Sequence, residues 1–129
     1  MKNVRALMTA NPITIEKSAP IYDAMKLLVE RQVTGLPVVD ADGALVGIIT
    51  EKDMLRLLYE RDVSDSAVSD FMTSNAVTFS PEDSIVDVCE CLIQNNFRRV
   101  PIVENGKLAG IISRADIIRY ILEVRRVNQ

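Results

Sequence analysis

Apolar side chains recur at helical spacing in two separate stretches of the chain. In each stretch the apolar positions are separated by three, one, three and one residues, a spacing that places them on one face of an α-helix. These positions are Ile21, Ala24, Met25, Leu28 and Val29 in the first stretch and Ile85, Val88, Cys89, Leu92 and Ile93 in the second. Ser18 and Pro20 mark the expected start of the first helix, and Ser80 and Pro81 that of the second. The pattern predicts two amphipathic helices, each with one buried face.

Two short β-branched runs follow each predicted helix. The runs are Leu36–Val39 and Leu45–Ile49 around Asp42-Gly43, and Val100–Val103 and Lys107–Ile112 around Asn105-Gly106. Asp-Gly and Asn-Gly pairs between apolar runs are typical of β-hairpins. Shorter extended pieces are expected at Thr14–Ile15 and Thr78–Phe79, ahead of the helices. A further helix is expected to begin at Thr50 after the first hairpin and at Ser113 after the second.

The helices expected after Thr50 and Ser113 are apolar around most of their circumference. Their apolar residues are Met54, Leu55, Leu57, Leu58 and Tyr59 in the first helix and Ile117, Ile118, Tyr120, Ile121 and Leu122 in the second. A small domain covers only one face of a surface helix, so the remaining apolar side chains need another partner. We therefore expect a homodimer joined through these helices.

The chain contains an internal repeat. Met8–Ile15 recurs as Met72–Phe79 at an offset of 64 residues, and Gly47–Asp53 matches Gly110–Asp116 at an offset of 63. The loss of one residue in a turn accounts for the change of offset, as expected for a duplication. The polar segment Glu60–Asp70 separates the two copies and is the natural linker.

Each copy has the order β-α-β-β-α. We predict a first repeat over residues 1–63, which includes the N-terminal strand, a linker over 64–70 and a second repeat over 71–129. A chain of 129 residues leaves each copy too small to close a core alone. We expect an α/β (α+β) fold in which the two β-α-β-β-α repeats pack about a pseudo-twofold axis, with two equivalent clefts at their junction.

Composition and charge exclude several function classes. The chain has the 48% hydrophobic and 26% charged residues of a globular protein, and no apolar run approaches the length of about 20 residues that a membrane span needs. Its net charge of −3 gives no general attraction to nucleic acid or to anionic membranes. The absence of His removes the commonest general base and most zinc or iron ligand sets. We expect a cytoplasmic, non-catalytic protein that binds neither nucleic acid nor membrane and requires no cofactor.

Thr50-x-x-Asp53 and Ser113-x-x-Asp116 are the candidate polar motifs. A Ser or Thr followed three residues later by an acid is typical of a helix capping box, in which the hydroxyl and the carboxylate bond to backbone N–H groups. A carboxylate can also accept hydrogen bonds from both hydroxyls of a ribose, and a helix N-terminus favours a phosphate. The two roles are compatible, and the sequence leaves both open. No Gly-rich phosphate loop is present, which argues against NTP hydrolysis.

The repeat order and its motifs resemble a tandem pair of CBS domains, or Bateman module. The resemblance rests on the Met-Thr opening, the Pro before an apolar strand and the Gly-Ile-Ile-[Thr/Ser]-x-x-Asp motif, and it extends from about Met8 to Glu123. It implies a stand-alone, dimeric regulatory module that binds AMP, ADP, ATP or S-adenosylmethionine in clefts between the repeats and signals to an unidentified regulated protein. The alternative is a constitutive dimerisation or interaction scaffold with degenerate pockets.

The resemblance also implies roles for individual residues. Ile13 and Val77 in the opening strands would contact the adenine, and Arg98 and Arg99 would contact phosphates. The first cleft would combine Ile13, Thr34 and Gly35 with Ser113 and Asp116, and the second would combine Val77, Arg98 and Arg99 with Thr50 and Asp53. The second cleft is therefore expected to be the more basic and the better site for di- or triphosphates.

Overall fold

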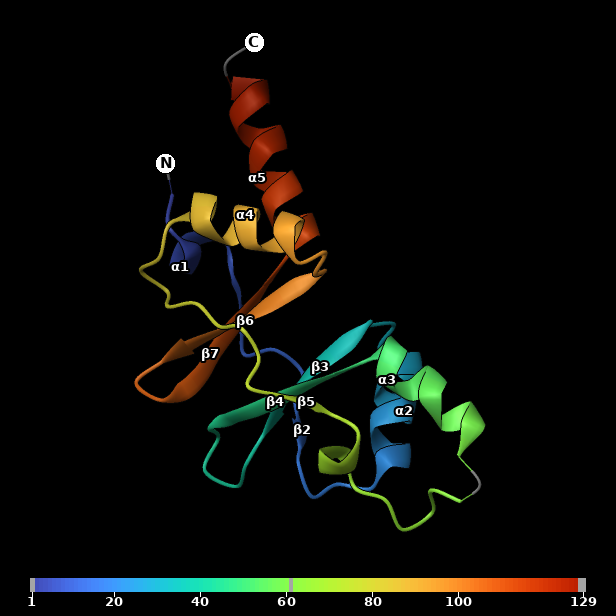
Figure 1. Cartoon of the computed structure of the whole chain (residues 1–129). Helices are drawn as coiled ribbons and strands as arrows, with labels where there is room; N and C mark the ends of the chain where they lie inside the picture. The colour runs from blue at the N-terminus through green and yellow to red at the C-terminus, as the bar shows by residue number, and fades with distance from the viewer. Residues whose placement is uncertain (1, 61, 128–129) are drawn as a thin grey trace. The chain divides into compact units, whose positions relative to one another are not determined.

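The computed structural model of the chain describes residues 2–60 and 62–127, so residues 1, 61 and 128–129 of the predicted repeats lie outside the described part. The chain forms two compact units. The middle unit is Ile13–Ala76, and the terminal unit combines Met1–Pro12 with Val77–Gln129. Each unit has its own sheet, helices and hydrophobic core (Figure 1). This mixture of helices and strands confirms the predicted α/β class.

The middle unit is built on a four-stranded sheet with the order β2-β3-β4-β5. Its elements are β2 (Ile15–Glu16), α2 (Ile21–Glu30), β3 (Gly35–Val39), β4 (Leu45–Thr50), α3 (Glu51–Leu55), the 3-10 helices η1 (Arg56–Tyr59) and η2 (Val68–Asp70), and β5 (Thr73–Ser74). Strand β2 runs parallel to β3, and the other neighbours are antiparallel. Ile21, Ala24 and Leu28 of α2 are buried in the core of this unit, which confirms the helix predicted from their spacing.

The terminal unit is built on a three-stranded sheet with the order β1-β7-β6. Its elements are α1 (Val4–Leu7), β1 (Thr9–Ala10), α4 (Ile85–Gln94), β6 (Arg99–Glu104), β7 (Lys107–Ser113) and α5 (Arg114–Val127). Helix α4 packs against β6 and α5, and α5 also packs against β7 (Figure 1). The extended piece predicted at Thr78–Phe79 is reduced to one parallel bridge between Phe79 and Ile102.

Both predicted hairpins are confirmed. Strands β3 and β4 pair antiparallel, as do β6 and β7. Gly43 turns the first hairpin with φ +85°, and Asn105 and Gly106 turn the second with φ 53° and 77°. Positive φ angles are available to Gly at no steric cost and to Asn more readily than to most residues. Gly43 in the first turn and the Asn105-Gly106 pair in the second therefore supply the residues with positive φ.

Helix α4 begins later than predicted. Ser80 and Pro81 do not start a helix, because the Ser80 N–H donates to Asp83 Oδ2 at 2.7 Å and closes a local turn. The helix begins at Ile85, with Ser84 as its N-cap. The prediction of the start was wrong because Ser and Asp side chains form turns of this kind as readily as they cap helices.

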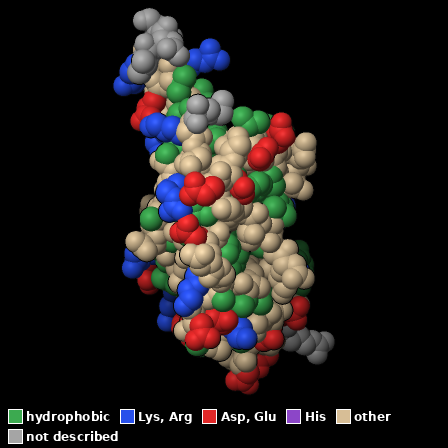
Figure 2. Space-filling view, turned by 90° about the vertical axis from the view of Figure 1, so that its left-hand side faces the viewer, with side chains coloured by type: hydrophobic (Ala, Val, Ile, Leu, Met, Phe, Trp, Pro, Cys, Tyr) green, Lys and Arg blue, Asp and Glu red, His purple; other side chains and the backbone are tan. Residues whose placement is uncertain are grey.

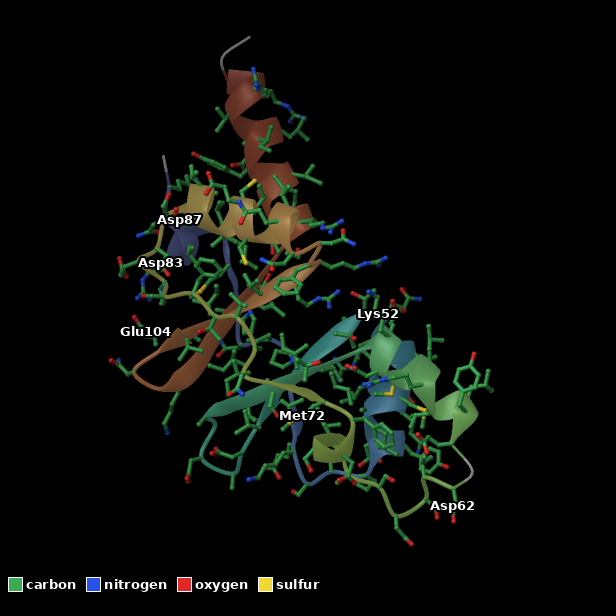
Figure 3. All side chains as sticks on the ribbon, viewed as in Figure 1. Lys52, Asp62, Met72, Asp83, Asp87 and Glu104 are labelled. Atoms are coloured by element: carbon green, nitrogen blue, oxygen red, sulfur yellow. The ribbon has the colours of Figure 1, made fainter. Side chains whose placement is uncertain are left out.

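The N-terminal strand lies with the second repeat, although the predicted boundaries assigned it to the first. Strand β1 pairs with β7, and β5 pairs in the same way with β4. A Cβ on Gly110 would lie 2.8 Å from Met8 Sδ, and a Cβ on Gly47 would lie 2.8 Å from Met72 Sδ. Figure 3 shows Met72 just before β5. The Met-Thr motifs can approach β7 and β4 this closely because each strand has a glycine at the contact.

Ion pairs at Arg5 hold α1 to the rest of the terminal unit. The guanidinium pairs with Glu104 at the end of β6 and with Glu82, the latter at 3.0 Å. The hydrogen bonds to Glu104 and then to Glu82 raise the pKa of Arg5 above its usual range. Glu104 is labelled in Figure 3 at the hairpin end of β6. These contacts join the N-terminal segment to residues that are distant in the sequence.

Charges of both signs are mixed on the face that Figure 2 shows. Figure 2 shows acidic and basic side chains interspersed on one face of the molecule, with apolar side chains between them. None of the described helices is both long enough and apolar enough to cross a membrane.

Candidate functional site

Asp53 and Asp116 occupy equivalent positions in the two units. Each lies in the first turn of the helix that follows a hairpin, α3 or α5. They are the two buried acidic residues in the part of the chain that the structure describes, with exposures of 6% and 8%. Since burying a charge without partners is costly, the surroundings of both carboxylates must supply hydrogen-bond donors.

One carboxylate oxygen of each Asp is used to cap its helix. Asp53 Oδ2 accepts hydrogen bonds from the Thr50 N–H at 2.8 Å and from Thr50 Oγ1 at 3.1 Å. Asp116 Oδ2 accepts from the Ser113 N–H at 2.8 Å and from Ser113 Oγ at 3.0 Å. Thr50 and Asp53 form a capping box, and the Asp116 N–H donates back to Ser113 Oγ at 3.3 Å. The capping interpretation of both motifs is confirmed.

The other carboxylate oxygen of each Asp faces an arginine three residues further along the chain. Arg119 lies within α5, whereas Arg56 is the first residue of η1, directly after α3. Arg56 Nη2 donates to Asp53 Oδ1 at 2.8 Å, and Arg119 Nη2 donates to Asp116 Oδ1 at 2.5 Å. Arg56 Nη2 also donates to the carbonyl oxygen of Phe71 at 3.3 Å. The arginine side chains are 63% and 68% exposed, so they cover the solvent side of a buried acid.

Sequence reasoning missed both arginines, although a signal for them is present. Arg56 and Arg119 are related by the offset of 63 residues that also relates Asp53 to Asp116. Each arginine stands three residues after its Asp, and residues at that spacing are neighbours on a helix surface. The repeated motif therefore extends to Thr/Ser-x-x-Asp-x-x-Arg.

Backbone pairing brings the predicted binding residues Thr34 and Gly35 close to the start of α3. In the middle unit Gly35 lies opposite Thr50, and the Glu51 N–H donates to the Thr34 carbonyl at 3.1 Å. The middle unit therefore brings Thr34 and Gly35, the first residue of β3, to the start of the helix that carries Asp53.

The terminal unit has the equivalent arrangement with more positive charge. Arg99 lies opposite Ser113, and the Arg114 N–H donates to the Arg98 carbonyl at 3.0 Å. Arg114 Nε also donates to the Phe97 carbonyl at 2.7 Å. Arg98 is exposed and Arg99 is half-buried. Arg98 and Arg99 thus lie at the start of the helix that carries Asp116, and their predicted combination with Thr50 and Asp53 stays a prediction.

Glu51 and Arg114 give the two helix starts different charges, which sequence reasoning also missed. They are equivalent residues, because the offset of 63 that relates the second helices also relates these two positions. Lys52, the next residue in the first turn of α3, is labelled in Figure 3 and corresponds to Ala115. The first turn of α3 thus begins with one acid and one base, and that of α5 begins with a base alone.

Ile13 and Val77 differ in their surroundings. Ile13 is partly buried against the core of the middle unit, just before β2. Val77 is 45% exposed at the beginning of the second segment of the terminal unit. Their contact with an adenine, and the sharing of each cleft between the two repeats, stay predictions.

A cavity of about 460 Å³ lies elsewhere in the middle unit. Its lining residues are Tyr22, Met25, Met54, Leu55, Leu57, Leu58, Glu60, Asp62 and Val63. None of the predicted binding residues lines it. The described residues also contain no cluster of three or more His, Cys, Asp or Glu side chains that could hold a metal ion.

The duplicated motif has a counterpart among known families. A model of the CBS domain matches residues 4–60 and again residues 68–123. The chain belongs to the CBS domain family. The two matched ranges correspond to the two sequence repeats, which confirms the tandem CBS pair.

Relatives of this CBS pair include proteins of different lengths. It is 33% identical over 126 residues to an uncharacterized 17.7 kDa protein of Acidianus ambivalens, covering 97% of this chain and 76% of that protein. It is 32% identical over 118 residues to the uncharacterized protein MJ1225 of Methanocaldococcus jannaschii, covering 92% of this chain. The CBS pair spans 42% of MJ1225 and 60% of the chloroplastic CBS domain-containing protein CBSX2 of Arabidopsis thaliana.

Two solved structures of CBS pairs contain adenosine compounds. CBSX2 in complex with AMP matches with a TM-score of 0.89 and 32% identity, over 97% of this chain and 99% of that one. The CBS domain pair of MJ0100, in complex with 5′-methylthioadenosine and S-adenosyl-L-methionine, matches with a TM-score of 0.82 and 29% identity, over 94% of this chain and 96% of that one. CBS pairs similar to this one thus bind ligands that share an adenosine group.

Proposed function

We propose that this CBS pair is a non-catalytic regulatory module that binds an adenosine-containing ligand and transmits its occupancy to another protein. The candidate ligands are AMP, ADP, ATP and S-adenosylmethionine. One observation carries the proposal: a buried carboxylate with a hydroxyl partner occurs at the same place in both units. The complexes of similar CBS pairs with AMP and with S-adenosylmethionine support the class of ligand.

The chemistry of the two carboxylates suits a ribose. Each carboxylate has about four acceptor positions, and the hydroxyl and backbone donors of the motif occupy two of them on Oδ2. Oδ1 accepts from one arginine and keeps a further acceptor position. A ribose hydroxyl can donate to this oxygen in a charge-assisted hydrogen bond. Capping and ribose binding can therefore operate together in Asp53 and Asp116.

We propose that each ligand is shared between the repeats. One site would combine Ile13, Thr34 and Gly35 with Ser113 and Asp116, and the other would combine Val77, Arg98 and Arg99 with Thr50 and Asp53. Of these predicted residues, Arg98 and Arg99 in the second site carry guanidinium groups, which match phosphate geometry. The second site would therefore prefer di- and triphosphates.

We propose that a second copy of the chain covers the exposed apolar residues of the second helices. Leu58 and Tyr59 in η1 are 85% and 86% exposed, and Ile121 and Leu122 in α5 are 48% and 56% exposed. These four residues are equivalent in pairs at the offset of 63. A surface that occurs twice in one chain can complement itself in a symmetric dimer. Ligand binding could then change the dimer and so what a partner protein contacts.

Calorimetry and thermal shift with AMP, ADP, ATP, NAD and S-adenosylmethionine test the proposal. A ligand that binds the folded chain at a concentration of 100 times its Kd should stabilise it by about 2.7 kcal/mol. At least one of these compounds is expected to bind and to raise the melting temperature. If none binds, these ligands are excluded, and the alternative of a constitutive interaction scaffold with degenerate pockets is favoured.

A further inference from the structure

Arg56 and Arg119 each contact the carboxylate oxygen that the helix cap leaves unused. Each guanidinium contacts Oδ1 of its Asp, while the helix cap uses Oδ2. The oxygen with spare acceptor capacity is therefore also the oxygen that the arginine covers. A sugar hydroxyl that donates to Oδ1 must share this oxygen with the guanidinium or displace it.

Displacement has an electrostatic cost that depends on the ligand. The guanidinium is attracted to a carboxylate that is more than nine-tenths buried, while its own exposed side lets water screen part of the interaction. A neutral sugar ligand offers the guanidinium no new charge to pair with. A ligand with a phosphate on the same sugar brings an anion next to the guanidinium, which can then donate to phosphate oxygens.

The arginines have donors to spare for such a contact. A guanidinium carries five N–H donors. Arg56 uses Nη2 for Asp53 and Phe71, and Arg119 uses Nη2 for Asp116. Their side chains are 63% and 68% exposed, so a ligand can reach them from solvent. Neither arginine has to abandon a buried position to turn toward a phosphate.

We propose that Arg56 and Arg119 make the two carboxylate sites selective for phosphorylated over unphosphorylated adenosine ligands. The inference rests on the proposed function, because it assigns the two arginines a part in the same sites. In the empty protein they compensate the buried Asp charges, and in the complex they donate to the ligand phosphate. Phosphate selectivity is then present in both repeats, in addition to any contribution of Arg98 and Arg99 in the second.

Binding of AMP and 5′-methylthioadenosine to the double variant R56M/R119M tests the proposal. The two probes share adenine and the ribose diol and differ at the 5′ position, where AMP alone has a phosphate. The ratio of the Kd of 5′-methylthioadenosine to that of AMP should fall by roughly ten- to a hundredfold in the variant, the range of one charge-assisted hydrogen bond. The affinity for 5′-methylthioadenosine should stay within a few fold of wild type or increase.

Two further variants separate selectivity from folding and from general charge. R56K/R119K keeps both positive charges. Its ratio of the Kd of 5′-methylthioadenosine to that of AMP should lie between those of the wild type and of R56M/R119M. Arg31 is an exposed arginine that follows α2 in the middle unit, and R31M removes a positive charge without touching either Asp. R31M should leave the ratio unchanged.

The outcomes distinguish this proposal from the proposed function. A wild-type chain that binds both probes, with a ratio that R56M/R119M leaves unchanged, overturns the role of the arginines alone. An equal loss of affinity for both probes assigns the arginines a purely structural role and also overturns it. A wild-type chain that binds neither probe nor any other adenosine ligand overturns the proposed function, and this inference with it.

Discussion

Met8 packs so closely on Gly110 that residue 110 has no room for a side chain. A Cβ at this position would lie 2.8 Å from Met8 Sδ and 2.8 Å from the carbonyl oxygen of Thr9. Met72 and Gly47 repeat the relationship in the middle unit, where Thr73 O would lie 2.7 Å from the added Cβ. The glycine of each Gly-Ile-Ile motif thus serves the packing of an edge strand next to the helix that carries the carboxylate.

We expect G110A to destabilise the chain by about 1–3 kcal/mol, the usual cost of overpacking. The contact with Met8 Sδ can relax through a side-chain rotation, but the contact with the Thr9 carbonyl requires a backbone shift. Urea unfolding followed by circular dichroism measures the change in the free energy of unfolding. In the M8A/G110A variant the sulfur contact is absent. The losses of stability in M8A and in G110A, added together, should therefore exceed the loss in the double variant. Fully additive costs would show that Met8 and Gly110 do not conflict.

The carboxylate sites provide a second prediction. D53A/D116A should reduce AMP affinity by roughly ten- to a hundredfold, because each site loses a charge-assisted hydrogen bond to the ribose. The wild type should bind 2′-deoxy-AMP more weakly than AMP, and the variant should bind the two alike. Calorimetry with both nucleotides measures the difference directly. Loss of the cap should also lower the stability of each helix by about 1 kcal/mol.

Asp23 and Asp87 provide the matched control for this prediction. They are equivalent acids in the first turns of α2 and α4, and Asp87 is labelled in Figure 3. D23A/D87A removes the same charges from helix N-termini outside the two carboxylate sites. It should lower stability slightly and leave the preference for AMP over 2′-deoxy-AMP intact. If D53A/D116A behaves as this control does, capping is the whole role of Asp53 and Asp116.

The hydrophobic pattern was sufficient to predict most of the fold. Spacings of three and one identified α2 and α4, and Asp-Gly and Asn-Gly located both hairpins, because these signals are local. The repeat offsets identified equivalent positions such as Asp53 and Asp116. The pairing of β1 with β7 was not predicted, because tertiary packing and not the local sequence determines the partner of a two-residue edge strand.

The candidate site was predicted only as far as its signals are local in the sequence. The capping motifs are local in sequence and were confirmed in both units. The covering arginines were missed because an arginine on an exposed helix face is ordinarily solvated, and a charge three residues from an acid adds little on a surface. Only the burial of Asp53 and Asp116, which the sequence does not display, gives Arg56 and Arg119 their significance.

A third prediction concerns the exposed apolar helices. At micromolar concentration the chain should sediment with a mass twice the 14.4 kDa of the monomer. L58D/I121D should shift it to the monomer, because a charge would have to be buried in the dimer interface. Analytical ultracentrifugation over a concentration series measures the association.

Ile93 offers a control at an equally apolar surface position. It is 74% exposed on α4, outside the helices expected to join the two copies. I93D should therefore leave the sedimentation unchanged. A monomeric wild type at every concentration would refute the dimer, and a shift by I93D as large as that by L58D/I121D would place the interface elsewhere.

The last prediction concerns which residues share one ligand. Cross-repeat sites require Arg99 and Asp53 to contact the same molecule, whereas Arg99 pairs in register with Ser113 and so belongs to the same unit as Asp116. A double-mutant cycle on ATP affinity distinguishes the two arrangements, because residues that serve one binding event are non-additive and residues of separate events add. R99A alone should lower the ATP affinity of one site by roughly ten- to a hundredfold, because a phosphate contact is lost. The double variant R99A/D53A should lose less binding free energy than the sum of the two single variants. In R99A/D116A the two losses should add. Coupling of Arg99 to Asp116 instead would mean that each site is built within a single unit, and that the most basic site contains Ser113 rather than Thr50.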